Sequence, residues 1–192
     1  MGIHQSQSRF YENILGRSRA FVHAIFPKGK EFFPEQLEGV DEEMFYRAIN
    51  KAEPSLIRTE ADELTYALHV MVRYEIEKML IAGELAVKDV PETWNRLYKE
   101  YLGVDVPDDS HGVLQDSHWS GGSFGYFPSY SIGSAYAAQM YAFMKKDLDV
   151  DALVAAGDLK PVVQWLADRV HRHGSLIDPP QVIENCCGES FD

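Results

Sequence analysis

The chain has 192 residues, of which 45% are hydrophobic, so it can bury a core and does not have the composition of a disordered protein. It carries 30 acidic against 18 basic residues, and the resulting net charge of −12 argues against nucleic acid as a partner, because phosphate binding needs clustered Lys and Arg. No stretch approaches the roughly 18 apolar residues of a membrane span, and no secretory leader is visible. The two cysteines, Cys186 and Cys187, are neighbours and predict free thiols in a reducing, cytoplasmic compartment.

The first part of the chain predicts helices. Apolar residues recur at helical spacing from residue 5 to residue 25, and Pro27 and Gly29 are expected to end this helix. A short helix is expected after Pro34, and another over residues 41–50.

The clearest helix is predicted over residues 55–81, where one apolar stripe ends at Gly83, a glycine typical of a helix C-cap. Further helices are expected over residues 91–102, 130–146, 151–156, 161–172 and 179–187. The pattern predicts a mainly α protein that forms a single helical domain over residues 1–192. The glycine-rich centre leaves room for at most a small β-hairpin.

That centre, Gly112 to Gly133, mixes glycines with aromatic and imidazole side chains. Glycine allows close backbone approach and positive φ, and aromatic rings give a wall with polar tips. These features favour a shaped loop beside a concave site. An irregular segment that fills a core between helices is an equally open interpretation. The ring-bearing residues are His118, Trp119, Phe124, Tyr126, Phe127 and Tyr130.

Within the predicted helix over residues 55–81, Arg58, Asp62, Thr65 and His69 follow one another at spacings that place them on one face. A column of this composition suits a polar cleft, where Arg58 could hold a carboxylate through two parallel hydrogen bonds. The plainer interpretation is a surface ion pair between Arg58 and Asp62, and it stays open.

None of the seven histidines has another four residues away, so H-E-x-x-H, a motif that supplies two zinc ligands and a general base, is absent. His171 and His173 are expected to cap helix carbonyls more readily than to bind a metal. His118, beside Trp119, is the best single candidate for a hydrogen bond to a ligand.

Several segments resemble a known family. IRTEADELTYALH (Ile57 to His69) and GVLQDSHWSGGSFGYFPSYSIG (Gly112 to Gly133) are similar to signature blocks of the thermostable carboxypeptidase family of zinc metallopeptidases, the carboxypeptidase Taq type. HQSQSR (His4 to Arg9) resembles the family's H-E-S-[QG]-S-R block, and HRHG (171–174) and GES (188–190) resemble its C-terminal segments. The blocks occur in the family's order and span essentially the whole chain.

This resemblance implies a mainly α, zincin-like protein, commonly dimeric, that removes C-terminal amino acids from peptides one at a time. It implies that a zinc ion is held by the two histidines of H-E-x-x-H and by the glutamate of H-E-S, with the remaining glutamate as general base. A chain that matches only from H-E-S onward resembles the truncated C-terminal part, less than half, of such an enzyme.

The chain differs from the family at a metal-ligand position and matches it at the positions implied to bind the substrate. Gln5 stands at the position of the third zinc ligand, and a neutral amide is a much weaker ligand than a carboxylate. We therefore expect no metal to be bound by this chain as it stands, although the family implies zinc or cobalt at full length. Arg58 matches the position implied to engage the substrate's terminal carboxylate. His118, Tyr126 and Tyr130 match the cleft-lining block, where an oxyanion or the substrate backbone could be contacted.

Three hypotheses follow. The first is a chain that keeps the substrate wall of a metallocarboxypeptidase and is inactive alone, in its sharper form a half-enzyme that needs a separate N-terminal partner. The second is a non-enzymatic helical module that self-associates as a homo-oligomer through exposed apolar faces. The third is a decayed remnant of an enzyme.

Overall fold

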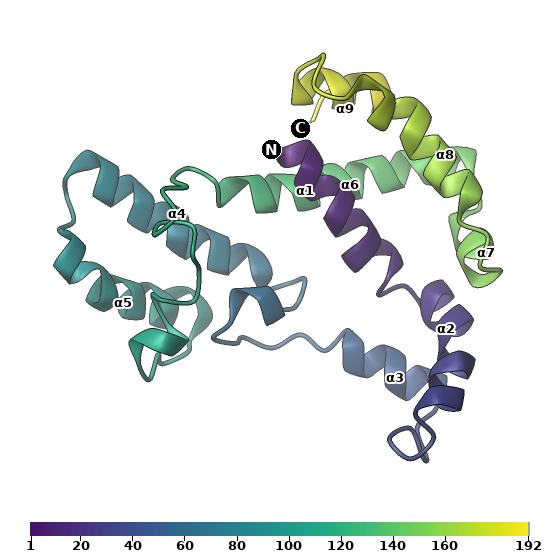
Figure 1. Cartoon of the computed structure of the whole chain (residues 1–192), viewed down its shortest axis with the longest axis horizontal. Helices are drawn as coiled ribbons and strands as arrows, with labels where there is room; N and C mark the ends of the chain where they lie inside the picture. The colour runs from purple at the N-terminus through teal and green to yellow at the C-terminus, as the bar shows by residue number, and fades with distance from the viewer. Residues whose placement is uncertain (192) are drawn as a thin grey trace. The chain divides into compact units, whose positions relative to one another are not determined.

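The computed structural model describes residues 1–191, and all regular structure in this range is helical, which confirms the mainly α prediction. The glycine-rich centre forms turns and irregular backbone up to Phe127, its last residues begin the helix that starts at Pro128, and it contains no hairpin strands among its described residues. The helices that Figure 1 labels are α1 (Gly2–Arg9), α2 (Arg19–Phe32), α3 (Glu42–Ile49), α4 (Tyr66–Ala82), α5 (Val90–Leu102), α6 (Pro128–Asp147), α7 (Val150–Ala155), α8 (Lys160–Arg169) and α9 (Pro179–Cys187). Within residues 1–191 no helix is both long and apolar enough to cross a membrane.

The described chain packs as two compact units. The central unit comprises Asn50–Ser131, and the terminal unit comprises Met1–Ile49 together with the chain from Ile132 onward. The single domain expected for residues 1–192 stays a prediction.

In the terminal unit, the helix predicted over residues 5–25 is divided in two. Helix α1 continues into a π-helical segment, Phe10–Leu15, and α2 starts after Ser18, whose hydroxyl accepts the backbone N–H of Phe21 at 3.1 Å. A serine cap of this kind satisfies an N–H that a new helix would leave unpaired. The predicted stop at Pro27 is also wrong, because α2 continues through this proline to Phe32.

The core of the terminal unit is formed by α1, the later part of α6 and helices α7 to α9. Its buried side chains include Phe10, Ala137, Met140, Met144, Val162, Leu166, Ile183, Cys186 and Cys187. Both cysteines are free. His171 contacts the amide of Gln7, with Nε2 and Oε1 2.8 Å apart, so it does not take the carbonyl-capping role predicted for it.

The central unit is built on α4 and α5, which pack against each other across a short turn (Figure 1). Gly83 ends α4 in the left-handed conformation expected of its C-cap, and Gly103 ends α5 in the same way. The apolar core between the two helices includes Val72, Ile76, Trp94, Leu97 and Tyr98. Helix α4 also carries three buried polar residues at four-residue intervals, His69, Arg73 and Glu77, and these organise the site described next.

Candidate substrate-binding site

Arg58 lies in a short 3-10 turn, Arg58–Glu60, and not in the long helix predicted over residues 55–81. Helix α4 begins only at Tyr66. The predicted polar column, with Arg58 and His69 on one face of the same helix, is therefore wrong.

Asp62 explains where α4 begins. Its carboxylate accepts the backbone N–H groups of Leu64 and Thr65 at 2.8 and 2.9 Å and the N–H of Glu53 at 3.1 Å. An aspartate that captures nearby N–H groups in this way favours a turn and a helix start over a helix interior. Asp62 is thus committed to the backbone, and the alternative interpretation, an intrahelical ion pair with Arg58, is wrong as well.

Arg58 pairs instead with Asp116, from the glycine-rich segment. Arg58 Nε lies 3.1 Å from Asp116 Oδ1, and Arg58 Nη2 donates to the same oxygen. Arg58 Nη1 donates to the hydroxyl of Tyr66 at 2.9 Å. A guanidinium and a carboxylate joined through two nitrogens form a charge-assisted pair of fixed geometry, which holds the Arg58 side chain in place.

A second arginine, Arg73 of α4, shares the same carboxylate. Arg73 Nε donates to Asp116 Oδ2 at 2.6 Å, and Nη1 donates to the His69 carbonyl and the Tyr98 hydroxyl at 2.8 and 3.2 Å. The Arg73 side chain is fully buried, whereas that of Arg58 is 7% exposed. Of the two arginine side chains, only that of Arg58 therefore has exposed surface that a ligand could contact.

Aromatic rings surround the arginines. The guanidinium carbon of Arg58 lies 4.7 Å from the ring centre of Tyr130 and 5.7 Å from that of Phe127, and Arg73 lies 4.4 Å from the Trp94 ring. Rings at these distances attract cations through their faces and exclude water. The core-filling interpretation of the glycine-rich segment holds for Phe127, which is buried, while the ring of Tyr130 lies beside Arg58. The concave site beside this segment stays a prediction.

Glu77 of α4 fixes the path of the glycine-rich segment. One carboxylate oxygen accepts the indole N–H of Trp119 at 2.7 Å, and the other accepts the backbone N–H of Gly125 at 3.1 Å. Gly125 has a φ of 74°, in the left-handed region that favours glycine. A buried carboxylate that is satisfied in this way anchors the segment that carries Asp116.

His118 and the two tyrosines of the cleft-lining block come together. His118 Nε2 lies 2.9 Å from the Tyr130 hydroxyl, and the His118 ring centre lies 5.5 Å from that of Tyr126. Burial lowers the pKa of His118 below its ordinary value, against the opposing influence of the Asp116 charge. The imidazole is therefore neutral at pH 7.

The charges of the cluster hold Asp116 ionised. Burial alone would raise the pKa of Asp116, but the hydrogen bond from Arg58 and the positive charges of both arginines outweigh burial and lower it. The pKa of Arg58 is raised: burial opposes the shift, and the hydrogen bond to Asp116 prevails. The pair therefore stays charged over the range in which the protein would work.

His69, the next buried polar residue, has Nδ1 3.1 Å from the Tyr98 hydroxyl and no exposed surface. Burial and then the positive charges of Arg73 and Arg58 lower its pKa from 6.5 to about 4. Between pH 6.5 and about pH 4, His69 therefore carries a second ring proton in the unfolded chain and not in the folded chain. Stability due to neutral His69 is complete above pH 6.5 and is lost as the pH falls.

We predict that the free energy of unfolding falls by about 2 kcal/mol between pH 7 and pH 5 through this residue, at about 1.4 kcal/mol per pKa unit. Denaturant titrations at both pH values measure it, and a His69→Gln variant, which cannot titrate, should show a smaller loss. Equal losses in the two proteins would remove His69 from this role.

Gln5, which stands at the family's third-ligand position and is not expected to bind a metal, lies in α1 of the terminal unit. Among residues 1–191 no group of three or more His, Cys, Asp or Glu side chains is arranged to hold a metal ion. With a neutral amide at position 5 and no partner ligands gathered in either unit, the described residues do not fit a zinc ion.

Solved structures of metallocarboxypeptidases match this fold over the whole chain. An M32 carboxypeptidase from Deinococcus radiodurans R1 superposes with a TM-score of 0.93 at 45% identity, and a carboxypeptidase from Pyrococcus furiosus with a TM-score of 0.95 at 42% identity. This chain covers 39% and 38% of those chains. The fold is thus that of one part of these helical carboxypeptidases.

The family model of carboxypeptidase Taq (M32) metallopeptidases matches residues 1–192, so the chain belongs to this family, as its motifs indicated. Carboxypeptidase 1 of Bacillus subtilis is 48% identical over the full chain, and thermostable carboxypeptidase 1 of Thermus thermophilus is 44% identical over 99% of it. The chain spans 38% and 37% of the length of these two relatives.

The sequence motifs pointed to Arg58, His118, Tyr126 and Tyr130. They did not indicate three residues that orient this cluster, Arg73, Glu77 and Asp116. His69, Arg73 and Glu77 recur every four residues and so lie on one face of a helix that is otherwise largely apolar. Charged residues are rarely buried in a protein without a partner. This spacing could therefore have indicated a polar face of α4 that is paired with other residues.

Proposed function

We propose that this chain forms the substrate-binding part of a metal-dependent carboxypeptidase that releases C-terminal amino acids, and that the chain alone has no peptidase activity. The family match over residues 1–192, with Arg58 placed at the edge of a buried charge cluster, carries this proposal. Arg58 binds the terminal carboxylate of the peptide, and His118, Tyr126 and Tyr130 line the cleft beside it.

The hydrogen bonds of Arg58 leave room for such a ligand. A guanidinium has five N–H groups. One on Nε and one on Nη2 point to Asp116, and one on Nη1 points to Tyr66. One N–H on each terminal nitrogen therefore remains for the two oxygens of a carboxylate. Asp116, shared with Arg73, neutralises only one of the two arginine charges, which favours an added anion.

The binding role predicts the effect of Arg58→Ala. Loss of a charge-assisted pair worth about 1.5–3 kcal/mol should weaken binding of an N-acetylated dipeptide by about 10- to 100-fold. Isothermal titration or ligand-observed NMR measures this change. Arg96→Ala, which removes an exposed arginine of the same unit, is the matched control and should bind normally. Unchanged binding in Arg58→Ala would exclude the proposed contact.

Catalysis needs groups that residues 1–192 do not contain. Water activation requires a metal with at least three good ligands and a base, and H-E-x-x-H is absent from this sequence. We propose that an N-terminal half supplies the ligands for zinc or cobalt and the general base. This half would be either a separate polypeptide or part of a longer chain. The peptide C-terminus is then held by the chain described here.

Reconstitution tests this proposal. The 192-residue chain is mixed with zinc or cobalt and with the N-terminal part of the Bacillus subtilis relative, and released C-terminal amino acids are measured. We expect no release by the chain alone, release by the mixture, and more release when the chain carries Gln5→Glu, because a carboxylate is the better ligand. Gln5→Glu alone should stay inactive. Turnover by the isolated chain, or a mixture that releases nothing, would refute the half-enzyme proposal.

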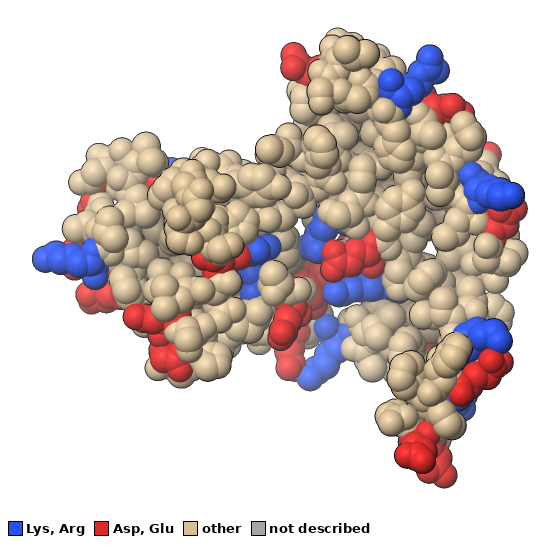
Figure 2. Space-filling model, viewed as in Figure 1, with Lys and Arg blue, Asp and Glu red and all other residues tan. Residues whose placement is uncertain are grey.

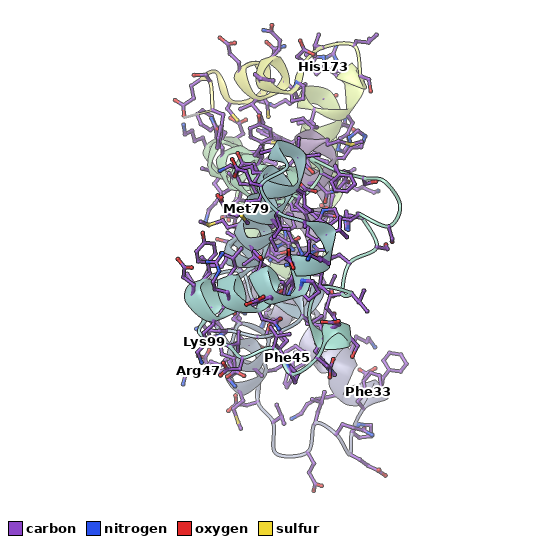
Figure 3. All side chains as sticks on the ribbon, turned by 90° about the vertical axis from the view of Figure 1, so that its left-hand side faces the viewer. Phe33, Phe45, Arg47, Met79, Lys99 and His173 are labelled. Atoms are coloured by element: carbon purple, nitrogen blue, oxygen red, sulfur yellow. The ribbon has the colours of Figure 1, made fainter. Side chains whose placement is uncertain are left out.

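An alternative function is a non-enzymatic module that self-associates as a homo-oligomer. Phe32 and Phe33, at the end of α2, are 75% and 57% exposed, and Met44 of α3 is 54% exposed. Phe33 points away from the ribbon in Figure 3. Exposed apolar groups of this size favour an interface. Light scattering on the chain and on a Phe32→Ser, Phe33→Ser variant decides, because a monomer in both cases contradicts this alternative.

The setting proposed for the protein is the cytoplasm, without nucleic acid or membrane partners. Two free thiols, Cys186 and Cys187, support a reducing compartment. On the face shown in Figure 2, acidic and basic side chains lie in small mixed groups, which gives no basic patch there for a phosphate backbone.

A further inference from the structure

The hydrogen bond between His118 and Tyr130 can run in either direction. A neutral imidazole carries one N–H and one acceptor nitrogen, and a phenol can donate or accept. With Nε2 2.9 Å from the hydroxyl, either His118 donates to the Tyr130 oxygen or Tyr130 donates to His118. The choice depends on which imidazole nitrogen holds the proton, and the surroundings of the other nitrogen, Nδ1, decide it.

Nδ1 of His118 is buried and has no hydrogen-bond partner among the described residues. The Oδ1 atom of Asp116 lies 3.7 Å away from it. A lone pair on Nδ1 would face this anionic oxygen and be repelled, whereas an N–H would be attracted. Of the charges that act on His118, that of Asp116 has the largest influence, ahead of the opposing charges of Arg58 and Arg73. The proton therefore belongs on Nδ1, and Nε2 carries the lone pair.

We infer that Tyr130 donates its hydroxyl proton to Nε2 of His118, so that the Tyr130 oxygen acts toward a ligand as a hydrogen-bond acceptor. Asp116 is then a positioning residue in two respects. It fixes the Arg58 guanidinium by direct hydrogen bonds, and it fixes the tautomer of His118 by its charge. Tyr130 would take an N–H of the substrate backbone, and it would not donate to an oxyanion.

The ligand in this assignment is the peptide C-terminus, so the assignment rests on the proposed function. It adds the terminal amide N–H to the carboxylate as a second group of the peptide that the site recognises. Arg58 and Tyr130 are neighbours, with the guanidinium carbon 4.7 Å from the ring centre. In a peptide, the carboxylate carbon and the amide nitrogen of the last residue are separated by two bonds of about 1.5 Å each. One C-terminal residue can therefore give its carboxylate to Arg58 and its amide N–H to Tyr130.

Nitrogen NMR of the histidine-labelled 192-residue chain at pH 7.5 tests the direction of the hydrogen bond without any ligand. A His118→Gln variant assigns the resonances. We expect the proton on Nδ1 and an unprotonated, hydrogen-bonded Nε2, and we expect Tyr130→Phe to shift only Nε2 strongly. A proton on Nε2 of His118 overturns the inference, whatever the protein's function.

A ligand pair tests the acceptor role. An N-acetylated dipeptide and its ester isostere differ at the last linkage, where the ester has no N–H. The ester should bind the native chain about 2- to 10-fold more weakly, and the two should bind Tyr130→Phe equally, because that variant has no acceptor there. Equal binding to the native chain contradicts the acceptor role. Failure of both ligands to bind would refute the proposed function, while the NMR result still decides the hydrogen bond.

Discussion

Replacement of Asp116 by asparagine is expected to lower the free energy of unfolding by about 3–5 kcal/mol, the usual cost of removing one partner from a buried ion pair. The side chain of Asp116 is 10% exposed and pairs with two guanidinium groups, those of Arg58 and Arg73. Asparagine keeps the shape and one acceptor oxygen but not the charge. Both arginines would remain in the low-dielectric interior, where no other ion pair to either of them occurs among the described residues.

Denaturant unfolding followed by tryptophan fluorescence measures this effect. Trp94 and Trp119 both lie in the central unit, and Trp94 stacks against Arg73, so the signal reports on the affected region. Asp105→Asn is the matched control, because its carboxylate is 84% exposed and pairs with Lys99 at the surface, where such pairs contribute about 0–1 kcal/mol. A loss in Asp116→Asn no larger than in Asp105→Asn would show that the cluster does not depend on this charge.

Helices with clear ends could be predicted from the sequence. Pro91 near the start and Gly103 at the end bound α5, and the prediction over residues 91–102 agrees with the structure within one residue. Helix α9 was predicted with its bounds, 179–187. These helices are defined by local signals, which do not depend on what the rest of the chain does.

The start of α4 could not be predicted, because two local signals compete there. Apolar residues continue at helical spacing upstream of Tyr66, but Asp62 captures the backbone N–H groups that a helix would use. Leu64, an apolar residue at this helical spacing, lies outside the helix and is 78% exposed. Spacing alone does not show which of the two signals prevails.

The site depends on contacts that are distant in sequence. Arg58 and Asp116 are 58 residues apart, and Arg73 and Asp116 are 43 apart. Their pairing requires the path that Glu77 imposes on the glycine-rich segment, which no local pattern encodes. The family motifs identified Arg58 and His118, whereas the network that orients them required the fold.

The second large effect is expected at Gly133 in α6, where α1 and α6 meet backbone to backbone. A Cβ added at Gly133 would lie 2.5 Å from the Gln5 Cβ, 2.9 Å from the Gln5 carbonyl carbon and 3.0 Å from the Ser6 nitrogen. Backbone atoms cannot rotate away, so the two helices must separate. We expect Gly133→Ala to lower the free energy of unfolding by about 3 kcal/mol, the upper part of the range for overpacked sites.

Gly29→Ala provides the matched control, since it makes the same change inside another helix of the terminal unit. There the new methyl would lie 3.7 Å from Leu37 Cδ1, an ordinary contact, and alanine should stabilise α2 by about 0.5–1 kcal/mol because glycine is a poor helix former. The two substitutions should thus shift the denaturation midpoint in opposite directions. Equal shifts would mean that the approach of α1 to α6 does not depend on the missing side chain at residue 133. Separation of the helices would also displace Gln5, so Gly133→Ala should reduce the reconstituted activity predicted for Gln5→Glu.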